Sequence, residues 1–203
     1  MSQFELRTLL AQQCELRAIQ PAEGDTGPPK IGGYAAVFNL RSELLGGSFV
    51  EEIAPGAFDG VMSQDVRALF NHNPNYLLGR TKSGTLRLSI DSRGLLYEID
   101  PPDTQTVRDL VMTPLLRGDM TGSSFTMLVA EDEWRQEGDL IVRTIHRIAE
   151  MRDVGPVAFP AYPDATAAQR SLDAWKQARD EGLPARAINE RAARLRVLEI
   201  LGA

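Results

Sequence analysis

Short apolar runs, each closed by turn residues, occupy most of the chain from Ile31 onward and limit what it can fold into. Five of them come first: IGGYAAVF, GGSFVEEI, VRALFNH, LRLSI and GLLYEID. Runs of this length, bounded by Gly, Pro, Asn and Asp, are typical of β-strands. Further along, SFTMLVAEDEW and LIVRTIHRIAEM flank a turn around Glu137 to Asp139 and predict a hairpin, and DVGPVAFPAY predicts a short strand that Pro160 ends.

Two segments in this region favour helices instead. APGAFDGVM, residues 54–62, predicts one short helix, and DTQTVRDLVMTPLLRG, residues 103–118, a longer one. In the longer segment Asp103 or Thr104 serves as N-cap and Gly118 as the stop. Pro114 predicts a kink or break. The expected fold class is therefore α+β, with a mostly antiparallel, barrel-like core and a few flanking helices.

The two ends of the chain differ in composition from the middle. A Pro/Gly-rich stretch, QPAEGDTGPPK, ends an N-terminal leader that is expected to be a strand or arm. From residue 169 the chain is rich in Ala, Arg and Glu, and Gly182 with Pro184 divides it into two helical pieces, the second with an apolar stripe that begins at Ile188. We therefore divide the chain into a leader and linker (1–30), a main domain (31–168) and a charged helical tail (169–203). Docking of the tail on its own domain and an intermolecular or disposable role both stay open.

Composition narrows the functional classes. The formal net charge of −6 gives no positive electrostatic potential that would attract nucleic acid. The single cysteine, Cys14, excludes an intramolecular disulfide framework and a cysteine-rich metal site. The first residues lack the pattern of a signal peptide, and no apolar stretch is long enough to span a membrane, so we expect a soluble intracellular protein. No ligand cluster calls for a metal or an organic cofactor.

A pair of serines in GDMTGSSFTM raises the question of a nucleophile. Serine is common in turns because its hydroxyl bonds to local backbone, which is the simpler explanation for Ser123 and Ser124. A serine nucleophile needs a base, and the chain has two histidines. His72 lies where an apolar run opens into a polar loop, a usual place for reactive side chains. His146 lies inside a predicted strand and favours a structural or surface role. Spacing alone does not decide between a catalytic and a structural histidine.

Five motifs, in order, resemble the prohead (procapsid) maturation proteases of tailed bacteriophages. They are GYAAVFN (33–39), EEIAPGAFD (51–59), DVRALFNHNPNYLLGRTKSGTLRL (65–88), RGDMTGSSFTM (117–127) and DVGPVAFPAYPDA (153–165). The resemblance covers about Ile31 to Leu172. It implies a serine endopeptidase with a fold related to the herpesvirus assembly protease.

The resemblance also assigns site residues. The histidine of the family's LFNH motif falls on His72, and its nucleophile, the serine just before a phenylalanine, falls on Ser124. Thr126 stands where the family usually has glycine, which narrows the space beside the nucleophile. The third member is usually a glutamate before the Pro-Ala motif; this chain has Asp153 there, with Glu150 as its nearest rival.

The implied substrates are the scaffolding region of the major capsid protein, other internal prohead proteins and the protease itself. Self-cleavage is expected within Arg170 to Ala203. The implied location is the host cytoplasm, inside the immature capsid, and the herpesvirus relatives suggest a homo-oligomer. Two alternatives stay open. One is an inactive, scaffold-like protein that binds capsid protein without cutting, and the other is a β-rich binding module in which the serine and histidine are incidental and lie far apart.

Overall fold

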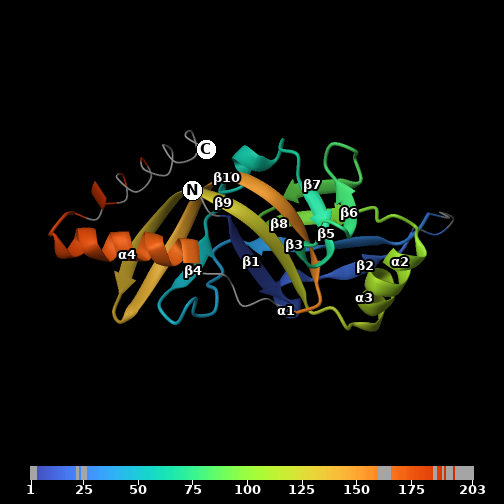
Figure 1. Ribbon diagram of the computed structural model, residues 1–203, viewed down its shortest axis with the longest axis horizontal. Helices are drawn as coiled ribbons and strands as arrows, with labels where there is room; N and C mark the ends of the chain where they lie inside the picture. Colours follow the sequence, from blue (N-terminus) through green and yellow to red (C-terminus); the bar gives the residue numbers. More distant parts are fainter. Residues whose placement is uncertain are drawn as a thin grey trace.

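Two β-sheets and a few short helices form the fold (Figure 1). The computed structural model describes residues 4–21, 23, 27–159, 166–184, 187–188, 190 and 194. In the six-stranded sheet the order is β1-β9-β10-β5-β6, and β4 also pairs with β10. Its strands are β1 (Glu5–Leu10), β4 (Val50–Ile53), β5 (Arg67–Leu69), β6 (Leu77–Arg80), β9 (Gly122–Glu137) and β10 (Leu140–Val157). The second sheet has the order β2-β3-β8-β7, with strands β2 (Arg17–Ile19), β3 (Lys30–Val37), β7 (Leu86–Ile90) and β8 (Gly94–Ile99).

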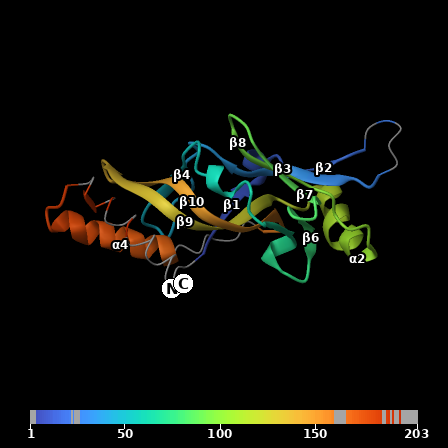
Figure 2. The same cartoon turned by 90° about the horizontal axis from the view of Figure 1, so that it is seen from above.

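A long β9–β10 hairpin runs through most of the molecule (Figures 1 and 2). It turns at Gly138, whose positive φ of 61° suits glycine, which confirms the predicted hairpin. The other edge of β10 takes β4 and β5 in parallel, while the remaining strand pairs are antiparallel. The α+β class is confirmed, but the barrel-like closure is not: the strands of the described residues form two separate hydrogen-bonded sheets.

The helix predicted for residues 54–62 is wrong. The structure has a single 3₁₀ turn there, η1 (Asp59–Val61), preceded by hydrogen-bonded turns. Gly56 has φ 90°, a backbone conformation that ends any regular helix at this point. Ala57, Phe58 and Val61 are nevertheless buried, so the apolar residues of this segment pack into the core although the segment is a series of turns.

The helix predicted for residues 103–118 forms, with an internal irregularity. It consists of α2 (Gln105–Val107), a π-helical turn η3 (Arg108–Met112) and α3 (Thr113–Arg117). Thr104 caps the start and Gly118, with φ 81°, ends it, as expected. The backbone N–H of Thr113, the residue before Pro114, donates a hydrogen bond to the carbonyl oxygen of Arg108, five residues earlier. The helix thus contains a π-turn next to the proline, which itself lacks an N–H.

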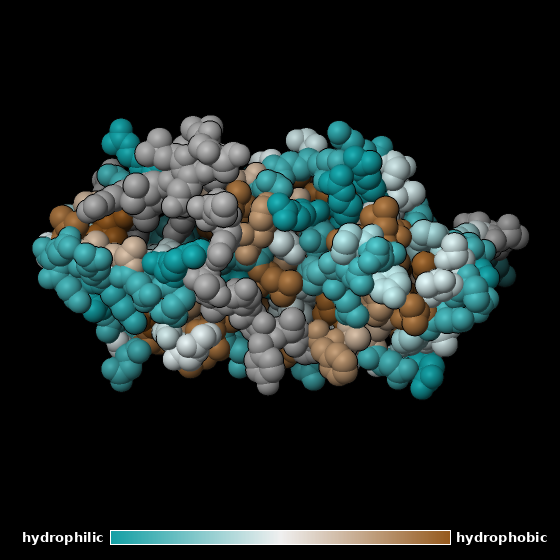
Figure 3. Space-filling view, in the orientation of Figure 1, coloured by the Kyte–Doolittle hydropathy of each residue, from teal (hydrophilic) through white to brown (hydrophobic). Residues whose placement is uncertain are grey.

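The main core lies between the sheets and includes Phe58, Phe125 and Met127. A second, smaller core lies near the hairpin tip, where α4 (Thr166–Asp180) packs on β9 (Figures 1 and 2). Trp134 meets Phe49 edge-on at 4.9 Å, and its indole N–H donates to the Ser171 hydroxyl at 3.0 Å. The outward side of α4 is polar, visible as teal at the left of Figure 3.

This packing answers part of the question about the tail. Leu172 and Trp175 are buried, so the first helical piece docks on its own chain. Ile188 of the second piece is buried in the same small core. The rest of the apolar stripe predicted there falls outside the described residues. Cys14, at the end of the short helix α1 (Ala11–Cys14), is buried and unpaired by any disulfide.

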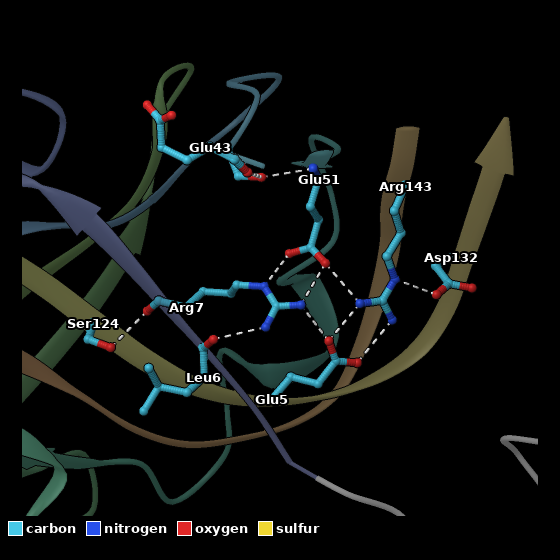
Figure 4. A network of polar contacts seen from close by, with 9 residues as sticks. Glu5, Leu6, Arg7, Glu43, Glu51, Ser124, Asp132 and Arg143 are labelled. Atoms are coloured by element: carbon cyan, nitrogen blue, oxygen red, sulfur yellow. Dashed lines mark hydrogen bonds and ion pairs between the residues drawn. The ribbon is translucent and has the colours of Figure 1, made fainter. Parts of the chain in front are cut away.

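A buried network of charges joins four strands of the larger sheet (Figure 4). Its members are Glu5 and Arg7 of β1, Glu51 of β4, Asp132 of β9 and Arg143 of β10. Arg143 donates to Glu5 at 2.6 and 2.9 Å, to Glu51 at 2.8 Å and to Asp132 at 2.6 Å. Arg7 grips the Glu51 carboxylate with two hydrogen bonds of 2.6 and 2.7 Å. Each buried charge therefore has an oppositely charged partner, as burial requires.

The charge network makes stability depend on pH. Burial alone raises the pKa of the Glu5 carboxyl, but the guanidinium groups of Arg143 and Arg7 outweigh it and lower the pKa from 4.5 to about 2. Because the pKa of Glu5 is lower in the folded state, its ionised carboxylate stabilises the fold at pH values above 4.5, the ordinary pKa of the group. This contribution is lost as the pH falls toward 2.

We predict that Glu5→Gln lowers the free energy of unfolding at pH 7 by roughly 3 kcal/mol, because two buried guanidinium groups lose a charged partner. The gap between wild type and variant should narrow between pH 4.5 and pH 2, as the wild-type carboxyl becomes protonated. Urea unfolding at several pH values measures both. Glu98→Gln, at a partly exposed ion pair, is the control and should cost less than about 1 kcal/mol. A gap that does not change with pH would contradict the assignment.

Candidate active site

The site lies at the end of the hairpin opposite its turn. Ser124 is near the start of β9, and Asp153 is near the end of β10. His72 closes the 3₁₀ turn η2 (Phe70–His72) that follows β5, which pairs with β10 in parallel. The His72 ring joins the two strands: its Nε2 is 2.7 Å from the Ser124 Oγ, and its Nδ1 is hydrogen bonded to the Asp153 carboxylate. The three residues that the sequence singled out therefore lie together.

The two adjacent serines face opposite sides of β9, as alternation in a strand requires. Ser124 faces His72, whereas the Ser123 hydroxyl donates to the hydroxyl of Tyr97 at 3.0 Å. Ser123 and Tyr97 are both buried, and burial raises the pKa of the Tyr97 phenol. Ser123 is thus part of the packing between the sheets and has no base within reach.

An unusual backbone turn presents the imidazole. Asn71 and His72 both have positive φ, 52° and 54°, in the left-handed region that residues other than glycine seldom adopt. The Asn71 side chain accepts a hydrogen bond of 2.9 Å from the N–H of Ala158, just beyond β10. This bond ties the turn to the neighbouring strand and holds the strained conformation. Strain of this kind is concentrated at functional sites.

A close approach between β5 and β10 also positions His72. Gly155 pairs with Ser124 across the hairpin, and a Cβ at Gly155 would lie 2.1 Å from the carbonyl oxygen of Leu69. No side chain fits there without moving the backbone. Since Leu69 directly precedes the turn that carries His72, the missing side chain at Gly155 is what lets the histidine reach the serine.

The rival residues lie elsewhere. Glu150 is exposed, and the charged atom nearest to it is the Arg152 Nε at 4.0 Å. One irregularity in strand register, between Met151 and Asp153, separates the position of Glu150 from that of Asp153. His146 is exposed and lies 3.3 Å from the Glu133 carboxylate, in agreement with the structural or surface role expected from the sequence.

Thr126 stands beside the catalytic candidates. It pairs with Asp153 across the hairpin, and its hydroxyl lies 3.3 Å from the Nδ1 of His72. The position where the resemblance expects glycine therefore carries a hydroxyl next to the imidazole–carboxylate contact.

A hydroxyl, an imidazole and a buried carboxylate in a row can produce a serine nucleophile. The imidazole accepts the hydroxyl proton, and the carboxylate orients the ring and stabilises its charged form. A family model described as caudovirus prohead serine protease matches residues 12–178. The chain belongs to the caudovirus prohead serine protease family. The resemblance seen in the five sequence motifs is confirmed, and the chain is a member of a serine protease family that acts in phage capsid maturation.

No curated protein and no solved structure matches this chain significantly. The binding-module alternative required His72 and Ser124 to lie far apart, and their 2.7 Å contact contradicts it. Within the described parts of the chain, no group of three His, Cys, Asp or Glu side chains could hold a metal ion. None of the helices described there is long and apolar enough to cross a membrane.

Sequence reasoning missed the contribution of the leader to this site. The carbonyl oxygen of Arg7 accepts a hydrogen bond of 2.8 Å from the Ser124 Oγ, and the Thr8 hydroxyl lies 3.0 Å from the same atom. These residues are more than a hundred positions before the serine. The segment FELRTLL has no feature that distinguishes such a contact from an ordinary edge strand.

The role of the close approach can be tested with Gly155→Ala. The added methyl group would collide with the Leu69 carbonyl and push the His72 turn away, so labelling of the serine by a fluorophosphonate should fall at least tenfold. Gly60→Ala is the matched control, because a Cβ there meets only an ordinary contact at 3.9 Å. Circular dichroism of both variants establishes that they fold. Full reactivity in a folded Gly155→Ala protein would show that the approach does not position the histidine.

A second pair of variants tests the carboxylate. Asp153→Asn should lower the rate of peptide cleavage by several orders of magnitude, since the amide no longer holds the imidazole in its reactive tautomer. Glu150→Gln should keep near-normal activity, because Glu150 is exposed and bonded only at long range. Steady-state kinetics on one peptide substrate compares the two. The reverse pattern would move the role to Glu150.

Proposed function

We propose that this protein is an endopeptidase in which Ser124 is the nucleophile, His72 the general base and Asp153 the residue that orients the base. The observation that carries the proposal is the His72 ring, which contacts the serine through Nε2 and the carboxylate through Nδ1. The buried position of Asp153 supports the same roles, because a desolvated carboxylate interacts strongly with an imidazolium.

The chemistry follows from these contacts. As the Ser124 Oγ attacks a peptide carbonyl carbon, His72 Nε2 accepts its proton, and the imidazolium forms beside the Asp153 carboxylate. His72 then returns that proton to the amine that leaves, and an acyl-enzyme remains on Ser124. A water molecule, activated by the same imidazole, hydrolyses the ester and restores the serine.

The family description supports the substrates and the location. We infer that the enzyme cleaves the scaffolding region of the major capsid protein, other internal prohead proteins and itself, inside the immature capsid in the host cytoplasm. Self-cleavage within residues 170–203 fits best after α4, since α4 itself is docked. We also propose that the fold is related to that of the herpesvirus assembly protease and that the protein forms a homo-oligomer. The division of the chain into leader, main domain and tail is part of the same proposal.

One observation favours the inactive, scaffold-like alternative. Ser124 is 0 % exposed, so no peptide reaches it in this conformation. An inactive member would keep its association with capsid protein and show no turnover.

Co-expression with a capsid precursor distinguishes the two functions. Ser124→Ala should abolish cleavage of the precursor and leave the fold intact, whereas Ser123→Ala should keep most of the activity, because its hydroxyl contacts Tyr97 and has no base. Gel electrophoresis and intact mass of the capsid protein give the readout. Equal loss in both variants would refute the choice of Ser124. An uncleaved precursor that co-purifies with the wild-type protein would favour the inactive alternative.

A further inference from the structure

Strand β1 covers the nucleophile. Around the Ser124 Oγ lie His72 Nε2 at 2.7 Å, the Arg7 carbonyl oxygen at 2.8 Å and the Thr8 hydroxyl at 3.0 Å. The hydroxyl has one proton, and two acceptors compete for it. The contact of Ser124 with the Arg7 carbonyl is drawn in Figure 4, and a proton donated there is not shared with the base. With three partners and no exposed surface, Ser124 has no room for a peptide carbonyl while β1 is in place.

The geometry of β1 is that of a bound peptide. It is the outermost strand of its sheet and pairs with β9 in an uninterrupted antiparallel register from Glu5↔Met127 to Leu10↔Gly122. Proteins commonly bind extended peptides by adding them to a sheet edge in this way. The Arg7 carbonyl, however, presents its oxygen to the nucleophile, whereas attack requires the carbon. The contact therefore occupies the site without being aligned for cleavage.

The side chain of Arg7 fills an acidic pocket. Glu51, on β4, receives two hydrogen bonds from the Arg7 guanidinium in a fork and a third from Arg143. The Glu51 side chain is 3 % exposed, so its charge acts in a poorly solvated place. A cavity of about 740 Å³ adjoins the pocket and is lined in part by Leu9, Ile53 and Phe125. A peptide in place of β1 would find an acidic contact for a basic side chain beside an apolar cavity.

We propose that β1 is a cis-acting inhibitory strand, and that a substrate peptide replaces it on the edge of β9 with an arginine or lysine facing Glu51. The proposal rests on the proposed function, in which Ser124 is the nucleophile. The basic residue is the one whose carbonyl faces Ser124, because that is the position of Arg7. The network that anchors Glu5 and Arg7 keeps the strand closed until a competing peptide offers equivalent bonds.

A reversible cross-link tests the inhibition. Leu9 and Ser123 are paired across β1 and β9, and the Cα separation of such pairs, about 4.5 to 5.5 Å, suits a disulfide. Because the Cys14 thiol lies against the backbone of Ser123, the double variant Leu9→Cys/Ser123→Cys is made in a Cys14→Ala background. Its oxidised form should be labelled by a fluorophosphonate at least tenfold more slowly than its reduced form, and non-reducing electrophoresis measures the cross-linked fraction. Each single cysteine variant in the same background should respond to reductant by less than twofold.

A specificity measurement tests the subsite and does not depend on the cross-link. Peptide coumarin amides that differ only in the last residue should show a kcat/KM at least tenfold higher for Arg than for Leu or Glu. Glu51→Gln should reduce this preference, whereas Glu137→Gln, which removes a carboxylate from a surface ion pair outside the cavity lining, is the matched control and should keep it. Urea unfolding shows whether each variant folds.

The outcomes distinguish failure of the inhibitory-strand proposal from failure of the proposed function. Equal labelling of the oxidised and reduced double variant overturns the inhibitory role of β1, and equal kcat/KM for Arg and Glu overturns the basic subsite. In both cases the wild type is still labelled at Ser124, so the proposed function stands. If reduced wild-type protein is labelled no faster than Ser124→Ala, the proposed function itself fails.

Discussion

The ion pairs of Arg143 hold the larger sheet in its register. This guanidinium is 1 % exposed and binds carboxylates from three other strands, including Glu5 of β1. Removing any one partner would leave a charge in a place without solvent, which costs several kcal/mol. A shift of β1 or β10 by one residue would turn these side chains to the other face of the sheet. The network therefore fixes which residue of β1 lies beside which residue of β9, and with it the surroundings of Ser124.

The sequence predicts most of the strands because their apolar runs are local. The separate strand predicted for DVGPVAFPAY is wrong, because residues 153–157 continue β10 and form its last part. The limits of β7 and the hairpin of β9 and β10 follow from run length and turn residues alone. The helix predicted at residues 54–62 failed because Gly56 adopts a left-handed conformation, which composition does not show. Barrel closure could not be judged either, since it depends on which strand edges meet, a property of the whole chain.

The site was predictable only in part. The local pattern favoured His72 over His146 but did not decide whether His72 is catalytic or structural. The family motif made that choice, and the structure places His72 against Ser124 and Asp153. The contribution of β1 had no sequence signal, because Arg7 and Glu51 are ordinary charged residues 44 positions apart. Likewise, the requirement for Gly155 arises from the backbone of a strand far away in sequence.

The three polar side chains of the site are synthesised in the order His72, Ser124 and Asp153, because they stand in that order in the sequence. His72 is made first, yet the carboxylate that orients it lies 81 residues later, on the last strand of the sheet. The stretch of β5 that precedes His72 has its parallel partner on that same strand. A nascent chain thus holds its imidazole and its serine without a scaffold to align them. The contact of His72 with both Ser124 and Asp153 can form only after β10 has been synthesised and has paired with β5 and β9.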